Sequence, residues 1–237
     1  VLDPVNSTAV RIGVDGGLAV TIDGGLRNAG SITALANEGN ASALVVGANA
    51  TLATINNQSV IRALSAGEAV NQAVAIDYLA GSTGGTLVNS GTIGAYIQGE
   101  AGNATAIRDA SGTLTSLTNS GIIEAVIAPT DATADQITGN TVAIDLSANT
   151  TGVTLTQEQV DPELDPTIVG DILLGSGADV VQINAGTVTG ALEFGAGADS
   201  LVIDGGAGVR GARADAAGLL NIRIAQGLPR APQAPAA

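Results

Sequence analysis

The sequence contains no cysteine and no histidine, and all eight of its basic residues are arginine. Without a thiol or an imidazole, no Ser/His/Asp or Cys/His nucleophile can be assembled, and zinc sites built on His and Cys are excluded. Without lysine there is no Schiff-base amine and no lysine to hold a phosphate. These absences remove several large classes of enzyme.

Aromatic side chains and basic charge are also scarce. The chain is 45% hydrophobic but only 1% aromatic, so Ala, Val, Ile and Leu must fill its core, as suits a narrow interior made of repeated small layers. Its 22 acidic residues against eight arginines give a formal net charge of −14. Nucleic acid and anionic membrane surfaces are therefore disfavoured as partners, because both require clustered cations.

Long apolar runs are missing as well. No run of about 18 apolar residues occurs, so no transmembrane helix is predicted. The chain opens "VLDPVNSTAV", without Met and without a signal peptide, and we interpret it as a processed or excised piece of a longer protein. The lack of cysteine fits a cell-surface protein of a Gram-negative bacterium, although many cytosolic proteins also lack it.

What the chain does contain is an internal repeat built on four asparagines. These are Asn28, Asn57, Asn89 and Asn119, spaced 29, 32 and 30 residues apart. Around each of them similar residues return at fixed offsets. The columns are Leu26, Ile55, Leu87 and Leu117 two positions before; Gly30, Ser59, Gly91 and Gly121 two after; Ile32, Ile61, Ile93 and Ile123 four after; and Ala34, Ala63, Ala95 and Ala125 six after.

The spacing inside each repeat is two, which indicates an extended strand with one face inward. A second strand precedes each anchor and is marked in three repeats by Ile76, Ile107 and Ile144. Each repeat is therefore expected to be strand, turn, strand and a variable stretch. In the C-terminal third, Gly170, Gly190 and Gly211 recur at spacings of 20 and 21, each with Ile168, Val188 or Val209 two positions earlier.

Repeats made only of strands cannot bury an apolar face alone and must stack on their neighbours. Stacking places equivalent residues about 4.8 Å apart, so the asparagines can hydrogen-bond along their column as a ladder. The glycine two places after each anchor suits a turn residue with positive φ. The sequence thus predicts an all-β fold, a right-handed parallel β-helix of roughly eight coils, with the Asn column as scaffold.

Four regions are predicted along the chain. Residues 1–155 form long coils with variable side loops, and residues 156–167 form an acidic, Pro-containing loop that we take as a sub-domain boundary. Residues 168–228 form short coils of about 20 residues, and the Pro/Ala-rich tail 229–237 is expected to be loose or extended.

Candidate binding residues are few. "GSGAD" and "GAGAD", ending at Asp179 and Asp199, resemble a calcium-binding roll motif, but the first glycine is missing and two isolated Asp are too few for calcium. The alternative is that both Asp cap turns at equivalent corners. The same stretch, "GSGADV", precedes a strand and not a helix, so it lacks the helix N-terminus that a dinucleotide requires.

Paired carboxylates are the remaining candidates, since two of them can hydrolyse a glycosidic bond. Such groups occur at Asp161, Glu163 and Asp165 and at Asp131 and Asp135, and we interpret both as solvated acidic loops. We therefore predict no catalytic, cofactor-binding or metal site, no cofactor and no enzymatic activity.

Several of these stretches carry a family resemblance. "NSGTIGA", "NSGIIEA", "TAIRDAS" and "TVAIDLS" resemble repeats of bacterial autotransporter passenger domains, which are secreted by the type V route. "GDILLGSGADVVQINAGTVTGALEFGAGADSLVIDGG" resembles the coils near the stable end of such passengers, and "AAGLLNIRIAQG" is similar to their final coils. The resemblance covers residues 8–228 and supports fold and secretion route more than any activity.

The resemblance implies export by a Sec signal and passage through an outer-membrane β-barrel, neither of which is in this sequence. We expect a non-catalytic rod on the surface of a Gram-negative bacterium, acting as a stalk or in adhesion or autoaggregation. Its partner would be a host or neighbouring-cell surface, or copies of itself. One alternative is a self-assembling fibre subunit that stacks head to tail through open ends. The other is a carbohydrate-active β-helix enzyme.

Overall fold

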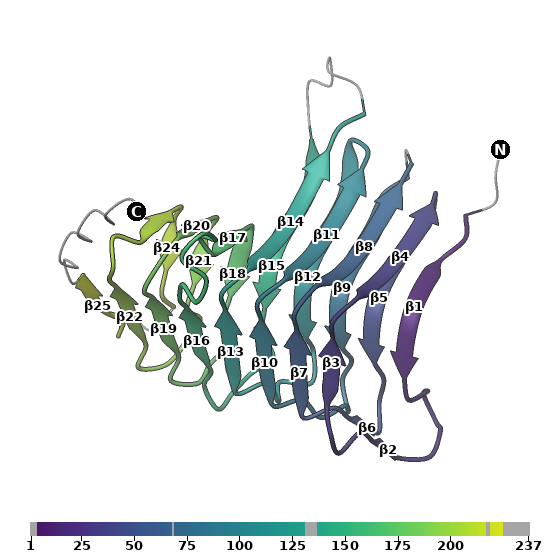
Figure 1. Cartoon of the computed structure of the whole chain (residues 1–237), viewed down its shortest axis with the longest axis horizontal. Helices are drawn as coiled ribbons and strands as arrows, with labels where there is room; N and C mark the ends of the chain where they lie inside the picture. Colours follow the sequence, from purple (N-terminus) through teal and green to yellow (C-terminus); the bar gives the residue numbers. More distant parts are fainter. Residues whose placement is uncertain (1–3, 68, 131–136, 217–218, 225–237) are drawn as a thin grey trace, which may run out of the picture.

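The computed structural model describes residues 4–67, 69–130, 137–216 and 219–224, and in them the chain forms a parallel β-helix (Figure 1). Every regular element in these residues is a β-strand, and three large parallel sheets run along the stack. Each coil supplies one strand to each sheet, which gives seven complete coils and a partial eighth. The predicted parallel β-helix of roughly eight coils is confirmed.

The strands are named here by sheet, in stacking order. Sheet 1 contains β1 (Ser7–Ile12), β5 (Ala41–Val46), β9 (Asn71–Tyr78), β12 (Ala101–Asp109), β15 (Thr138–Asp145), β18 (Asp171–Leu173), β21 (Leu192–Glu193) and β24 (Arg213–Ala214). Sheet 2 contains β3 (Leu26–Asn28), β7 (Thr54–Asn57), β10 (Thr86–Asn89), β13 (Ser116–Asn119), β16 (Thr154–Gln157), β19 (Val180–Ile183), β22 (Ser200–Ile203) and β25 (Asn221–Ile224). Sheet 3 contains β4 (Ser31–Asn37), β8 (Val60–Ala66), β11 (Thr92–Gln98), β14 (Ile122–Ala128), β17 (Thr167–Val169), β20 (Thr187–Thr189) and β23 (Gly208–Arg210). A small pair, β2 (Val20–Thr21) and β6 (Ala50–Thr51), joins the first two coils.

The prediction of two strands per repeat is wrong, because each complete coil has three. The segment around each anchor is divided at the asparagine: β3 ends at Asn28 and β4 begins at Ser31. The turn between them leaves the inward positions Asn28 and Ile32 an even number of residues apart, so the spacing of two persists across the break. Periodicity therefore did not reveal the turn.

The role predicted for the glycine after each anchor is also wrong. Neither Gly91 nor Gly121 has a positive φ. A Cβ atom on Gly91 would lie 2.0 Å from the carbonyl oxygen of Ser59, and one on Gly121 would lie 2.1 Å from that of Gly91. The close approach of neighbouring coils, and not the backbone conformation, therefore requires glycine here.

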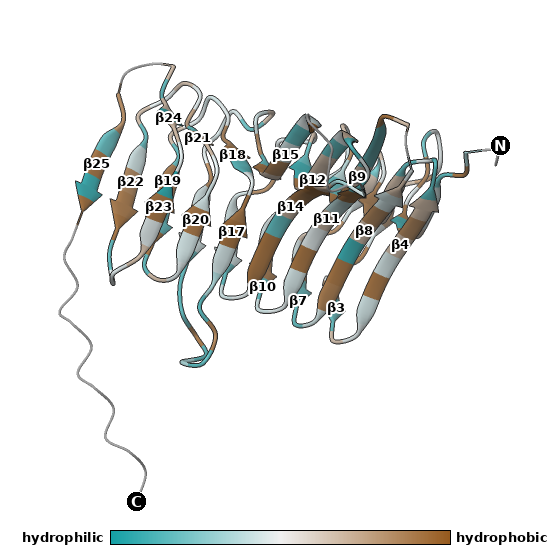
Figure 2. Ribbon diagram, turned by 90° about the horizontal axis from the view of Figure 1, so that it is seen from above, coloured by the Kyte–Doolittle hydropathy of each residue, from teal (hydrophilic) through white to brown (hydrophobic). Residues whose placement is uncertain are grey.

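The core consists of vertical columns of like residues. In sheet 3, Ile61 pairs with Ile93 and Ile93 pairs with Ile123, and the column continues into the short coils through Ile168. These four side chains are fully buried. Figure 2 shows apolar bands at equivalent places on neighbouring strands. Alignment of the repeats was thus sufficient to predict which side chains stack.

The stack has a wide section, residues 7–145 (β1–β15), and a narrow section, residues 154–224 (β16–β25). In the wide section β14 has 7 residues and β15 has 8, whereas β17 and β18 in the next coil have 3 each. Gly170 alone connects β17 to β18, with a φ of 118°. Figure 1 shows this step as an abrupt shortening of the strands.

The acidic loop, residues 158–166, leaves the stack between β16 and β17. It does not interrupt the sheets, because β16 pairs with both β13 and β19, and β17 pairs with both β14 and β20. A sub-domain boundary at 156–167 stays a prediction about independent folding. The tail 229–237 lies outside the described residues. Among those described, no helix reaches the length and apolarity that crossing a membrane would need.

Candidate functional site

The asparagine anchors form the predicted ladder. Asn28 pairs in register with Asn57, Asn57 with Asn89, and Asn89 with Asn119. Each Nδ2 donates to the Oδ1 of the next asparagine, at 2.7, 2.8 and 2.8 Å. The side chains are buried, and their amides also donate to backbone carbonyls such as that of Ile122, 3.1 Å from Asn89 Nδ2. The asparagine amides thus bond both to one another and to the backbone of the turns, and so hold each turn on the next.

The ladder continues one coil further than the repeat predicted. Asn119 Nδ2 donates to Gln157 Oε1 at 3.1 Å, and Gln157 Nε2 closes the row by donating to the carbonyls of Ala185 and Thr187. In the following coils Ile183 takes the same position. The sequence did not suggest Gln157, because its repeat has a different length and residue type at the anchor.

A second polar column, which the sequence analysis missed, lies along the start of the sheet 1 strands. Asn6 Oδ1 accepts from the N–H of Asn40, and Asn40 Oδ1 accepts from the N–H of Gln72, both at 2.8 Å. Two coils later Asn103 Oδ1 accepts from the N–H of Asn140 at 3.2 Å. The column is mostly exposed, unlike the buried ladder. Its signal was an amide residue just before or inside each of the first five strands of sheet 1.

Asp179 and Asp199 occupy equivalent positions in consecutive coils, one residue before β19 and β22, whose first residues Val180 and Ser200 pair. They point inward and are 0% and 2% exposed. Asp179 Oδ1 accepts from the N–H of Val153 at 2.8 Å, and Asp199 Oδ1 accepts from the N–H of Asp179 at 2.9 Å. Each carboxylate therefore binds a backbone N–H of the preceding coil.

Burial raises the pKa of Asp179 to about 6. The N–H of Val153 opposes the rise, the neighbouring Asp199 carboxylate adds to it, and the N–H of Gly175 opposes it. The glycine-rich stretch before Asp179 connects β18 to β19, so no helix follows it. The described residues contain no group of three or more His, Cys, Asp or Glu that could hold a metal ion.

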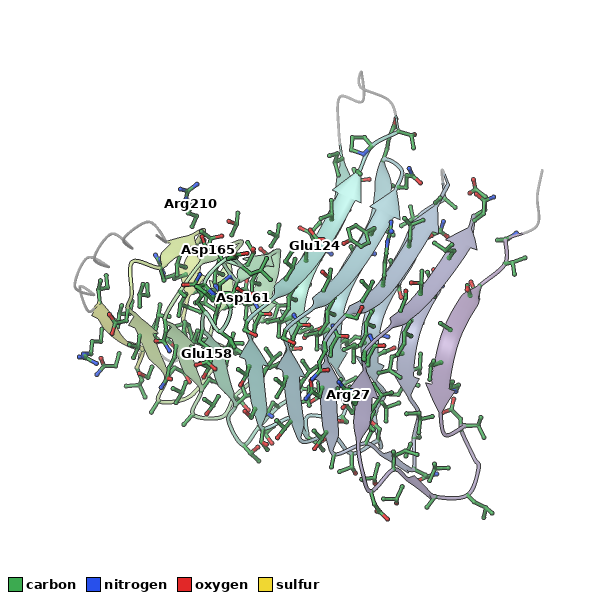
Figure 3. The ribbon with its side chains drawn as sticks, viewed as in Figure 1. Arg27, Glu124, Glu158, Asp161, Asp165 and Arg210 are labelled. Atoms are coloured by element: carbon green, nitrogen blue, oxygen red, sulfur yellow. The ribbon has the colours of Figure 1, made fainter. Side chains whose placement is uncertain are left out.

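The carboxylates of the acidic loop hold the loop itself. Asp161 Oδ1 accepts from the N–H of Glu163 at 2.9 Å, and Asp165 Oδ1 accepts from Gln159 Nε2 at 3.1 Å. Figure 3 shows Glu158, Asp161 and Asp165 around the narrow section. The other predicted acidic pair, at positions 131 and 135, lies outside the described residues.

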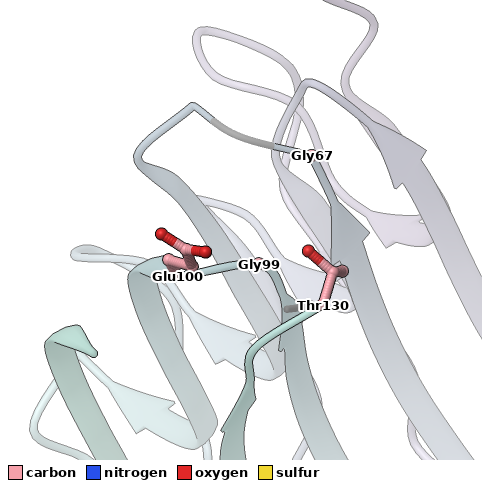
Figure 4. Close-up of a pocket in the computed structure, with 4 residues that line it drawn as sticks. All are labelled: Gly67, Gly99, Glu100 and Thr130. Carbon is pink, nitrogen blue, oxygen red and sulfur yellow. The ribbon is translucent and has the colours of Figure 1, made fainter. Parts of the chain in front are cut away.

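Two hollows on the surface are small. One, of about 210 Å³, is lined by Gly67, Gly99, Glu100 and Thr130, and Figure 4 shows its two side chains on either side of Gly99. The other, of about 200 Å³, lies between Leu164 and Asp165 of the acidic loop and residues such as Ile122. Each hollow has one carboxylate among its described lining residues, whereas glycoside hydrolysis generally uses two.

A polar trio crosses the outer face of sheet 3. The Tyr96 ring lies over Gly94, Arg62 stacks 4.8 Å from the ring centroid, and the Tyr96 hydroxyl donates to Glu124. Burial and, next, this hydrogen bond raise the pKa of Tyr96. The ring fills the gap that a glycine leaves in a strand, which is a structural use of an aromatic side chain. The other two aromatic residues, Tyr78 and Phe194, are fully buried.

Sheet 1 carries an ion pair on its outer side. Arg108 Nε and Nη2 donate to the two oxygens of Asp77 at 2.8 and 2.6 Å, and Asp77 is 3% exposed. The hydrogen bonds to Asp77 raise the pKa of Arg108, against the effect of burial.

Comparison with known protein families, with curated proteins and with solved structures finds no match.

Proposed function

We propose that the protein is a non-catalytic extracellular β-helical rod of an autotransporter-like surface protein, acting as a stalk or as an adhesive surface. The observation that carries this proposal is the continuity of the stack. The three large sheets run from the first coil to the last described one, and the buried polar groups bind neighbouring coils. The eight coils span on the order of 35 Å, so several such stretches in series would make a long stalk.

The outer face of sheet 2 supports the adhesive form of the proposal. No strand of this sheet contains Asp or Glu, although the chain has 22 acidic residues. Two rows of uncharged side chains run along the outside of six consecutive coils, partly or fully exposed: Thr54, Thr86, Ser116, Thr154, Val180 and Ser200, and Asn56, Val88, Thr118, Thr156, Gln182 and Val202. A flat, uncharged and regular face is suited to contact with another surface, while the acidic remainder limits non-specific clumping.

An adhesion or aggregation assay on cells that display the chain tests the proposal. Thr54→Asp with Thr118→Asp places two carboxylates on the outer face of sheet 2, in coils that do not touch. The matched control is Thr150→Asp at an exposed turn. If the outer face of sheet 2 is adhesive, the double variant should lose adhesion and the Thr150→Asp control should keep it. Unchanged adhesion of the double variant would contradict an adhesive role for this face.

A second variant separates the stalk from the adhesive surface. Inserting ten copies of residues 58–89 after Asn89 lengthens the stack by about 48 Å and keeps the anchor register, because each copy again ends on an anchor asparagine. A stalk predicts that adhesion rises where reach limits contact, for example between cells with long surface polysaccharide. Equal adhesion of both lengths in every such setting contradicts the stalk.

Head-to-tail assembly into fibres has less support from the ends of the stack. The first coil presents β1 with 6 residues and β4 with 7, whereas the last described strands of sheets 1 and 3 have 2 and 3 residues. Stacking narrow on wide would leave much of the wide edge unpaired. Electron microscopy of the purified chain distinguishes the two: single short particles favour the rod, and long filaments favour the fibre.

A further inference from the structure

Asp179 and Asp199 stand in a row that is otherwise apolar. The pairing of β16, β19, β22 and β25 places Val153, Asp179, Asp199 and Leu220 one above the other, each one residue before its strand. Val153 is buried, and Leu220 packs against the core. Two carboxylates thus replace two hydrocarbon side chains inside the narrow section.

In each of the two carboxylates, one oxygen has a hydrogen-bond partner and the other has none. The Oδ1 atoms accept from the N–H groups of Val153 and Asp179. The Oδ2 atoms of Asp179 and Asp199 are buried and have no hydrogen-bond partner. Neighbouring coils lie about 4.8 Å apart, so two ionised carboxylates here would repel each other without water to screen them. Such a pair requires a neutralising group.

We propose that Asp179 and Asp199 hold one proton between them, and that this proton makes the narrow section more stable in mildly acidic than in neutral surroundings. The protonated carboxyl donates to the ionised one, and both unpaired oxygens then have a partner. The amides of the wide section perform the equivalent task without a proton, since an amide both donates and accepts.

The surroundings of the pair favour a proton over a metal ion. Calcium requires six to eight oxygen ligands. The row offers two carboxylates between the apolar side chains of Val153 and Leu220, and no third acidic ligand joins them among the described residues. The following coil contributes Asp215, whose Oδ2 accepts from the N–H of Leu220 at 2.8 Å. Asp199 is the charged side chain that acts on Asp179.

The direction of the pH effect follows from the folded and unfolded states. In the folded chain the pKa of Asp179 is about 6, raised from an ordinary value of 3.8. The site therefore contributes its full stability below the ordinary pKa and loses it as the pH rises through about 6. The unfolding equilibrium constant of the narrow section should increase by roughly 100-fold from this site alone.

To test the proposal, the full-length wild type and the Asp179→Asn variant are unfolded by denaturant at about pH 4.5 and at about pH 7.5. The variant amide can still accept from the N–H of Val153 and carries no charge. We expect Asp179→Asn to be more stable than the wild type at the higher pH and similar to it at the lower pH. The control, Asp161→Asn in the exposed loop, should follow the wild type. An equal difference between Asp179→Asn and wild type at both pH values would overturn the proposal.

Two further measurements keep the proposal testable if the variant does not fold. A ¹³C NMR titration of the wild-type carboxyl groups should show one of the two buried aspartates titrating near pH 6, and ordinary titration of both overturns the shared proton. Millimolar calcium at neutral pH should leave the wild-type unfolding curve in place. Stabilisation by calcium that Asp179→Asn abolishes would assign the site to the metal.

Discussion

The wide and narrow sections share one core but differ in how they turn from sheet 3 to sheet 1. In the wide section β11 runs on to Gln98 and β12 starts at Ala101, so two long strands meet at a short turn. In the narrow section a single residue, Gly170, makes the same connection, and a Cβ on it would lie 2.8 Å from the N of Ala143 and 3.3 Å from the Cβ of Ala125. The short coil is therefore the minimal unit, and the wide coil is that unit with longer strands in sheets 3 and 1.

The two sections also place their buried polar groups differently. The wide section holds a row of amides at the turn between sheets 2 and 3, and amides satisfy one another. The narrow section continues that row with Gln157 in its first coil and then with Ile183 and Ile203, and it places Asp179 and Asp199 at the corner between sheets 1 and 2. The buried Asp77 of the wide section is neutralised by Arg108, whereas Asp179 and Asp199 lie in neighbouring coils with one unpaired oxygen each, so the narrow section depends on a proton.

Of the substitutions considered, Gly190→Ala should cause the largest loss of stability, and the loss should fall on the narrow section. Gly190 has a φ of 144°, and an added Cβ would lie 2.2 Å from the carbonyl oxygen of Gly170. Backbone strain and the collision together should cost about 4 kcal/mol or more and open the narrow coils. Limited proteolysis should then cleave residues 168–224 while the wide section stays protected.

Gly206→Ala is the matched control for that change. Gly206 also has a positive φ, 78°, but its Cβ would have no atom within 4 Å. Only the conformational strain remains, so the free energy of unfolding should fall by about 1 kcal/mol. Similar losses for Gly190→Ala and Gly206→Ala would show that close stacking does not set the need for glycine.

The next largest loss of stability should come from a substitution in the wide section. Asn89→Ala removes the acceptor for Asn57 Nδ2 and the donor to Asn119 Oδ1, and leaves the carbonyls of Gly91 and Ile122 with one bond fewer. Unsatisfied buried groups of this kind should lower the free energy of unfolding by about 3 kcal/mol.

Asn28→Ala, at the open end of the same row, is the control. Asn28 donates to one neighbouring asparagine and is 6% exposed, so its loss should cost about 1 kcal/mol. Denaturant midpoints measure both variants. If the interior and terminal changes cost the same, the row does not act as a connected ladder.

The smallest effect should come from Tyr96→Phe, on the outside of the wide section. The ring still covers Gly94 and still meets Arg62, and only the hydrogen bond to Glu124 is lost. We expect a loss of about 0.5–1 kcal/mol, measured from the shift of the denaturant midpoint. Tyr96→Ala should cost clearly more, because it also uncovers Gly94. Equal losses would mean that the ring contributes nothing there.

How much of this the sequence could predict depends on repetition. The Asn28–Asn119 ladder and the isoleucine column through Ile61 and Ile123 were predictable, because stacking places identical residues at identical heights. The change to short coils was predictable from the regular return of Gly170 and its equivalents. Repetition fixes which residues meet.

Other features were not predictable, because repetition does not fix the backbone path inside a coil. The turn after Asn28 preserved the spacing of two and so hid a third strand. Gly91 looked like a residue with positive φ, whereas its constraint is the carbonyl of Ser59 in the coil before it. The inward direction of Asp179 depends on where β19 begins, which no local signal marked.

Side-by-side register of consecutive coils underlies both sections, and a disulfide can measure it because the chain has no cysteine of its own. Val88 pairs with Thr118 on the outer face of sheet 2, whereas Ser116 lies two residues away from that partner. Val88→Cys with Thr118→Cys places two Cα atoms about 4.8 Å apart, within disulfide range, and Val88→Cys with Ser116→Cys places them about 8 Å apart. Mass spectrometry after mild oxidation should find an internal disulfide in the first pair only; a disulfide in the second pair and not the first would contradict the stacking on which the whole account rests.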